Sequence, residues 1–268
     1  MKKVRLHWTV HPEKDQEWYE REKARMTDDE VARELDINYN FSVAGTVFKN
    51  EFKPSIHTFQ EDYEVNPNLP VIRAVDYGRV NAALFAQQSK HGNLFIFKEL
   101  LLEESNTKLQ AEAVSTYSSG LKCAGFKDFG DPAGRNPDHR TETTDDEIMS
   151  RYGINPTYYK SGSIQNRVKE GVQLLKLKLS ERYNGEECIQ ISEQGCPVLI
   201  EAFNFGYRYK TDMNNQVVHK DLIQEEHPFE DVMDCLRYMV IELFDAKPRR
   251  EKPLRPIRTA VKNYYTGH

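Results

Sequence analysis

Short apolar runs and amphipathic helical segments alternate along the chain from Val71, and this alternation constrains the fold more than any other feature. Four runs have the length and residue types of strands: 71–78, 80–88, 93–102 and 123–131. Helical spacing is found in four further segments: 106–120, 145–153, 163–183 and 227–244. A set of hairpin strands followed by strands and helices in alternation predicts a mixed α/β sheet with helices on both faces.

The segment before Val71 has a different pattern. Residues 12–26 have helical composition, with Pro12 in the expected first turn, and residues 27–36 begin with the capping box Thr27–Glu30. Residues 37–48 alternate as a strand or hairpin would, and 49–70 lack a period, which predicts a linker. Two later stretches complete the pattern: 196–209 fits a helix or a strand equally, and 207–223 reads as a hairpin around 213–215.

Composition excludes several classes of protein. Hydrophobic residues make up 38% of the 268 residues, and no run approaches the ~18 apolar residues that span a membrane. The start of the chain runs directly into charged residues, so we expect no secretory signal. Four cysteines without a CxxC pair predict reduced thiols rather than a disulfide framework or a zinc knuckle.

The net charge of −5 is unevenly distributed. Residues 246–268 carry seven basic residues against Glu251 alone, a net charge of +6, and the rest of the chain therefore carries −11. A basic, proline-punctuated tail of this kind can bind phosphates or an acidic protein surface. A solvated tail without a partner is the alternative.

Four acidic residues lie where apolar elements end or begin. Asp76 closes the first strand and Asp131 a later one, whereas Asp231 and Asp234 are three residues apart on the last helix and share a face. Carboxylates gathered from two strand ends and a helix repel one another, and bound Mg²⁺ or Mn²⁺ relieves that repulsion. Two such ions about 3.5–4 Å apart activate a water and stabilise the leaving oxygen in phosphodiester hydrolysis. The four acids thus indicate a two-metal site.

Each of these acids also has a structural interpretation. Asp76 precedes Gly78 as a turn former would, and Asp131 before Pro132 fits an N-cap. Asp231, near the start of its helix, complements the helix dipole. A structural role is harder to assign to Asp234, which lies one turn further on among apolar residues. The sequence leaves both interpretations open.

Other catalytic chemistries lack their motifs. The eight histidines are scattered without an HExxH or Hx₃H pair, and no Gly-x-Ser-x-Gly elbow is present. The Gly-x-x-x-x-Gly-Lys-[Ser/Thr] phosphate cradle is also missing. We therefore expect neither a zinc enzyme nor a serine hydrolase, and no ATP hydrolysis by this chain alone.

Three stretches, RAVDYG, FKDFGDPAG and HPFEDVMDCLRYMV, occur in that order. In this order the sequence resembles the nuclease domain of the large terminase subunit of tailed bacteriophages, and residues 7–48 are similar to the end of the terminase ATPase domain and its lead-in. The resemblance covers most of residues 1–245. It implies an RNase H-like mixed sheet flanked by helices, and an endonuclease that cuts concatemeric double-stranded viral DNA during genome packaging.

The resemblance also implies roles for individual residues. Asp76 matches the first-strand ligand that bridges two Mg²⁺ or Mn²⁺ ions, and Asp131 and Asp234 match ligands that hold one ion each. Asp231 matches a position that holds a second acid or a histidine in the family, and we expect it to assist directly or through water. The hairpin 207–223 matches an element beside the active site. The basic residues expected to hold DNA phosphates, without reading sequence, are Lys160, Arg167, Lys169 and Lys210. For each of them, a solvated surface charge is the alternative.

Three regions follow from this interpretation: the end of an ATPase domain with its linker (1–60), the nuclease domain (61–245) and the basic tail (246–268). The missing Walker motif predicts a C-terminal fragment beginning at an introduced Met1, or else a motor split between chains. The resemblance implies that the partners are DNA, the portal protein, the small terminase subunit and the terminase ATPase domain, and that no membrane is involved. It further implies a place in the host cytoplasm during infection, outside the mature virion.

Two other functions stay open at the level of sequence. Another RNase H-like enzyme, such as a junction resolvase or an integrase, would use the same acids on branched DNA or in joining chemistry. A non-catalytic docking module would instead bind an acidic portal surface, or DNA, through the tail.

Overall fold

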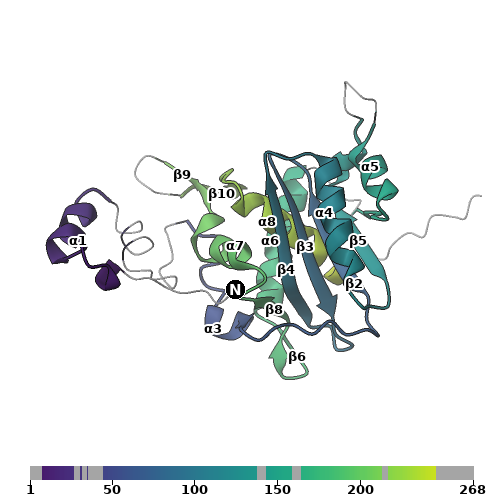
Figure 1. Cartoon of the computed structure of the whole chain (residues 1–268), viewed down its shortest axis with the longest axis horizontal. Coiled ribbons are helices and arrows are strands. Elements are labelled where there is room, and N and C mark those ends of the chain that lie inside the picture. The colour runs from purple at the N-terminus through teal and green to yellow at the C-terminus, as the bar shows by residue number, and fades with distance from the viewer. Residues whose placement is uncertain are drawn as a thin grey trace, which may run out of the picture.

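The computed structural model describes residues 8–26, 31, 35, 45–137, 143–158, 164–212 and 217–245. Its centre is a six-stranded sheet with the order β1-β8-β4-β3-β2-β5 (Figure 1). The strands are β1 (Thr58–Phe59), β2 (Val71–Asp76), β3 (Val80–Gln88), β4 (Leu94–Glu103), β5 (Phe126–Gly130) and β8 (Ile189–Ser192). β2, β3 and β4 pair antiparallel, whereas β5 is parallel to β2 and β8 is parallel to β4 and β1. The predicted mixed sheet is confirmed.

Helices cover both faces of this sheet (Figure 1). One face packs against α4 (Thr107–Ser119) and α5 (Asp145–Arg151), and the other against α6 (Ile164–Leu179) and α8 (Phe229–Phe244). Strand β2 is buried on both sides because its residues alternate between the two cores. Val71 and Val75 lie in the α4 core, and Ile72 and Ala74 lie in the α8 core.

Shorter elements complete the chain. The helical ones are η1 (Trp8–Val10), α1 (Gln16–Lys23), α3 (Pro54–His57), η3 (Pro132–Arg135), α7 (Pro197–Glu201) and the π-helix η4 (Ala202–Gly206). Two small hairpins pair β6 (Arg182–Tyr183) with β7 (Glu186–Glu187), and β9 (Tyr209–Thr211) with β10 (Val217–Ile223). None of the helices in these ranges is long and apolar enough to span a membrane.

The linker predicted over 49–70 is wrong for its first part. Pro54 opens α3, and the two residues that follow the end of this helix, Thr58 and Phe59, form β1, which pairs with β8 at the edge of the sheet. Phe52 stacks on Phe203 with ring centroids 4.3 Å apart, and His57 is buried. This segment is ordered because its aromatic side chains are buried against a distant part of the chain. Such contacts leave no periodic pattern in the local sequence.

Two helices begin later than the sequence predicts, and one ambiguous segment is helical. α1 begins after Asp15, whose carboxylate accepts a hydrogen bond from the amide of Trp18 at 2.8 Å, so Pro12 lies outside the helix. The ambiguous stretch 196–209 is helical in α7 and η4. The last helix, expected over 227–244 with Pro228 in its first turn, begins at Phe229 with Pro228 as its N-cap.

Some expectations fall outside the described residues. The helix over 27–36 is described only at Val31 and Leu35, both buried, and the tail 246–268 is not described. The hairpin over 207–223 forms as β9 and β10, but its turn at 213–215 lies outside the described residues.

Candidate active site

Asp76 is the last residue of β2 and is only 8% exposed. The alternation along β2 directs its side chain to the face that α8 covers, beyond Ile72 and Ala74. Its backbone is fixed from the other face, because the buried Gln110 donates to the carbonyl oxygens of Asp76 and Ala82 at 2.9 and 2.7 Å. The carboxylate is therefore held at the carboxyl end of β2, between β3 and β5 in the sheet.

Asp131 directly follows β5, the parallel neighbour of β2. Parallel strands end at the same edge of a sheet, so Asp131 lies at the same edge as Asp76. Its Oδ1 accepts a hydrogen bond from the amide of Ala133 at 2.9 Å. Asp131 thus caps η3, as the structural interpretation expects, while its carboxylate also lies among other acids.

The third and fourth acids come from α8, which packs across β2, β3 and β5. The hydroxyl of Tyr238 lies 2.9 Å from Oδ1 of Asp76 and 3.5 Å from Oδ2 of Asp234, and so connects the strand acid to the helix acid. Oδ2 of Asp234 also accepts from a guanidinium nitrogen of Arg237 at 2.5 Å. The helical spacing of these three α8 residues, three and four positions apart, puts them on one face.

Asp231 lies one turn before Asp234 and is buried. Its Oδ2 is 2.7 Å from Nδ1 of His227. Its Oδ1 is close to the end of β2, since a Cβ added to Gly78 would lie 3.9 Å from it. Asp231 is thus beside the other three acids but has a partner of its own.

Burial and mutual repulsion perturb these carboxyl groups. Burial raises the pKa of Asp76 well above its ordinary value, and the charges of Asp234 and Asp131 raise it further, against the hydrogen bond from Tyr238. The pKa of Asp131 is raised chiefly by burial, and the pKa of nearby Glu230 is raised to about 7, again chiefly by burial. Burial, with Asp234 and Asp76, also raises the pKa of Tyr238, so its hydroxyl stays protonated.

These acids suit a divalent cation by their chemistry. Carboxylate oxygens are the ligands that Mg²⁺ and Mn²⁺ prefer, and a cation would relieve the repulsion that raises the pKa of Asp76. Within the described ranges, no three His, Cys, Asp or Glu side chains already converge on one ion position. The hydrogen bonds from Tyr238 and Arg237 occupy carboxylate oxygens that a cation would need.

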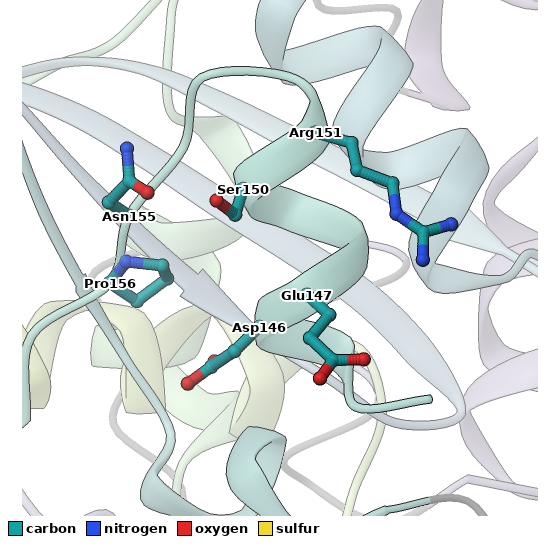
Figure 2. Close-up of a pocket in the computed structure, with 6 residues that line it drawn as sticks. All are labelled: Asp146, Glu147, Ser150, Arg151, Asn155 and Pro156. Atoms are coloured by element: carbon teal, nitrogen blue, oxygen red, sulfur yellow. The ribbon is translucent and has the colours of Figure 1, made fainter. Parts of the chain in front are cut away.

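A cavity of about 310 Å³ opens beside these acids. Asp131 and Asp234 form part of its lining, Arg167 and Val168 of α6 another part, and Ile241 continues it along α8. The pocket in Figure 2 is larger, about 430 Å³, but contains none of the four acids. There Asp146, Glu147 and Arg151 project from α5 (Figure 2), on the opposite face of the sheet from α8. Chemistry rather than size therefore selects the cavity at Asp131.

Of the four basic residues predicted to bind DNA, only Arg167 is described beside the acids. Arg167 lines the cavity, and its charge acts on the carboxyl group of Asp131. Lys169 and Lys210 are exposed, on α6 and β9, and neither lines the cavity. Lys160 lies outside the described residues.

Arg237, Tyr238 and Glu230 belong to the site, although no role in it was predicted for them from the sequence; Arg237 and Tyr238 close the Asp-x-x-Asp-x-x-Arg-Tyr stretch, which is the most specific part of the resemblance. The first two follow Asp234 at positions i+3 and i+4, a spacing that places side chains together on a helix. A tyrosine and an arginine beside a predicted metal ligand were therefore a readable signal.

Comparisons with known proteins bear on the fold. No family model and no curated protein matches the chain. Among solved structures, the large terminase from a thermophilic bacteriophage aligns over 90% of this chain with a TM-score of 0.54 at 12% identity. The P22 large terminase nuclease domain aligns over 76% of this chain and 93% of its own length, with a TM-score of 0.51 at 16% identity.

The chain has the RNase H-like fold of a large terminase nuclease domain. At these identities the likeness concerns the fold, and it confirms the fold expected from the sequence. The chain spans about half the length (55%) of the large terminase from the thermophilic bacteriophage.

Proposed function

We propose that this chain is a metal-dependent endonuclease that cuts concatemeric double-stranded viral DNA during genome packaging. The main support is that three carboxylates from separate parts of the chain meet at one edge of an RNase H-like sheet. Asp76 and Asp131 come from the ends of parallel strands, and Asp234 is joined to Asp76 through the Tyr238 hydroxyl.

Asp76, Asp131 and Asp234 would hold two Mg²⁺ or Mn²⁺ ions, with Asp231 assisting. Such ions supply Lewis acidity and lower the pKa of an attacking water. The remaining tasks belong to the protein. Tyr238 holds the carboxylates of Asp76 and Asp234 close together, because its protonated hydroxyl lies between them.

Among the four basic residues predicted to hold DNA, Arg167 is the best placed to hold a backbone phosphate, because it lines the cavity beside Asp131. Lys160, Lys169 and Lys210 would extend that contact along the DNA, by charge and without sequence preference. The basic tail 246–268 would bind the acidic surface of a portal protein, with the small terminase subunit and the terminase ATPase domain as further partners.

This assignment starts from the division expected from the sequence: residues 1–60 from the ATPase domain and linker, 61–245 as the nuclease and 246–268 as the tail. It moves α3 and β1 (Pro54–Phe59) into the nuclease, because β1 pairs with β8 of the central sheet. It also puts the protein in the host cytoplasm during infection, outside the mature virion.

Cleavage of supercoiled plasmid by the purified 268-residue chain tests the proposal, with Mg²⁺, Mn²⁺ or EDTA. We expect linear and shorter products with either metal, none with EDTA, and none from Asp234→Asn. Glu242→Gln is the matched control, because Glu242 lines the same cavity from α8 outside the proposed ligand set. A folded chain that cuts with neither metal, or that cuts only branched DNA, would contradict the proposal.

A further inference from the structure

Arg237 is a buried cation in direct contact with a proposed metal ligand. The residue is 4% exposed, and one guanidinium nitrogen lies 2.5 Å from Oδ2 of Asp234. Its Nε has no hydrogen-bond partner within the part of the chain that the structure describes. A buried guanidinium with an unsatisfied N–H is unfavourable unless a nearby charge compensates it, and here that charge is Asp234.

The facing helix leaves room for this side chain. A Cβ added to Gly171 of α6 would lie 2.3 Å from Cγ and 2.6 Å from Cδ of Arg237. Glycine within a helix is less favourable than alanine, so its presence at this position needs a reason. Close passage of the Arg237 stem supplies that reason.

We propose that Arg237 is a positioning residue that holds Asp234 in the metal-free protein, and that a divalent cation must displace its guanidinium from Oδ2 to bind. This inference rests on the proposed function, since it assumes that Asp234 is a metal ligand. One oxygen that accepts a hydrogen bond at 2.5 Å cannot at the same time direct that lone pair at an ion. The guanidinium charge also repels an ion arriving at the same carboxylate.

The displaced guanidinium can pair with another carboxylate in the same cavity. Arg237 itself lines the cavity of about 310 Å³, and Glu230 lines it as well. The carboxylate of Glu230 offers the guanidinium an alternative partner within the same cavity. Exchange of one carboxylate for another lets the cation take Asp234 without leaving a buried charge unpaired.

Binding of Mn²⁺ alone to the full chain, measured by the electron paramagnetic resonance signal of the free ion, tests this competition without any DNA cleavage. We expect Arg237→Met to bind Mn²⁺ at least about fivefold more tightly than the wild type, since removal of a charge beside a ligand is worth on the order of 1 kcal/mol. Arg237→Lys should bind it with wild-type affinity. Gly171→Ala pushes the arginine stem aside while keeping its charge, so it too should bind Mn²⁺ more tightly. Gly171→Ala also decides the question if Arg237→Met does not fold.

Unchanged or weaker Mn²⁺ binding in Arg237→Met and Gly171→Ala would overturn the competition while leaving the metal centre intact. Absence of Mn²⁺ binding in the wild type and all three variants would overturn the metal centre, and this proposal with it. The two failures are therefore distinguishable.

Discussion

The carboxylate of Asp76 lies at the end of a strand in which every residue is buried. It accepts a hydrogen bond from the Tyr238 hydroxyl, and the charges of Asp234, Asp131 and Asp231 act on it. Without a cation, the fold therefore opposes ionisation of Asp76, and this opposition weakens the folded state at neutral pH.

Asp76→Asn should lower the rate of metal-dependent cleavage by more than about a hundredfold. Loss of a residue that only hydrogen-bonds to a metal ligand already lowers metal affinity or activity ~10–100-fold, and Asp76 is a proposed ligand itself. The same variant should be more thermally stable than the metal-free wild type at about pH 8, because asparagine keeps the oxygen that accepts from Tyr238 and removes the buried charge. Plasmid cleavage and thermal denaturation in EDTA measure the two effects. Retained cleavage would remove Asp76 from the mechanism.

At the scale of elements, a second buried ion pair connects β2 to β5 on the side of the sheet that α4 covers. Arg73 donates to both carboxylate oxygens of Asp128, at 2.6 and 2.9 Å, and the amide of Asn155 donates to one of them at 2.7 Å. These bonds fix the two strands whose ends carry Asp76 and Asp131.

Asp128→Asn should lower the free energy of unfolding by about 3–5 kcal/mol, because it leaves the guanidinium of Arg73 buried without its counter-ion. Urea unfolding followed by circular dichroism measures the loss. Asp62→Asn is the control, since Asp62 is exposed and the same change there should stay within about 0.5 kcal/mol. Equal stability of the two variants would show that the pair contributes little.

Helix α7 depends on a buried acid of β4. Glu99 accepts from the amides of Val198 and Leu199 at 2.8 and 2.9 Å, at the first turn of the helix. Burial nevertheless raises the pKa of Glu99 to about 7, above the 4.5 of an exposed glutamate. The folded state therefore binds more protons than the unfolded state between these pH values, and stability falls as pH rises through them.

Glu99→Gln should remove this part of the pH dependence. As pH rises from about 4.5 to about 7, the free energy of unfolding of the variant should increase relative to that of the wild type by on the order of 3 kcal/mol, because each pKa unit corresponds to about 1.4 kcal/mol. Urea unfolding of both proteins at about pH 5 and pH 8 measures this difference, because most of the interval between the two pKa values lies between these pH values. Parallel stability curves would mean that Glu99 ionises in the folded protein as it does in water.

Elements with strong local patterns were predictable from the sequence. β2, β3, α4, α6 and α8 were anticipated within a few residues, because their apolar spacing is set by the cores they face. β1 was not, because two residues cannot carry a period and their pairing partner β8 is far along the chain. The contacts of Arg237 and Tyr238 with the acids were also not anticipated, since they depend on how α8 crosses β2.

At the scale of the whole molecule, the site exists only in the folded chain, because β2, the end of β5 and α8 each supply an acid. A cation that binds these acids binds the folded state alone and must stabilise it.

Mn²⁺ at about a hundredfold its dissociation constant should add about 2.7 kcal/mol to the free energy of unfolding. Thermal denaturation with Mn²⁺ and then excess EDTA measures this. An equal shift in Asp76→Asn would point to binding elsewhere.

The location of the cations in the folded protein is the most direct test of the account. Crystals of the full chain grown with Mn²⁺ should give anomalous difference peaks bonded to the carboxylates of Asp76, Asp131 and Asp234. Peaks on the α5 acids instead, or no peak at this edge of the sheet at Mn²⁺ concentrations that support DNA cleavage, would contradict it.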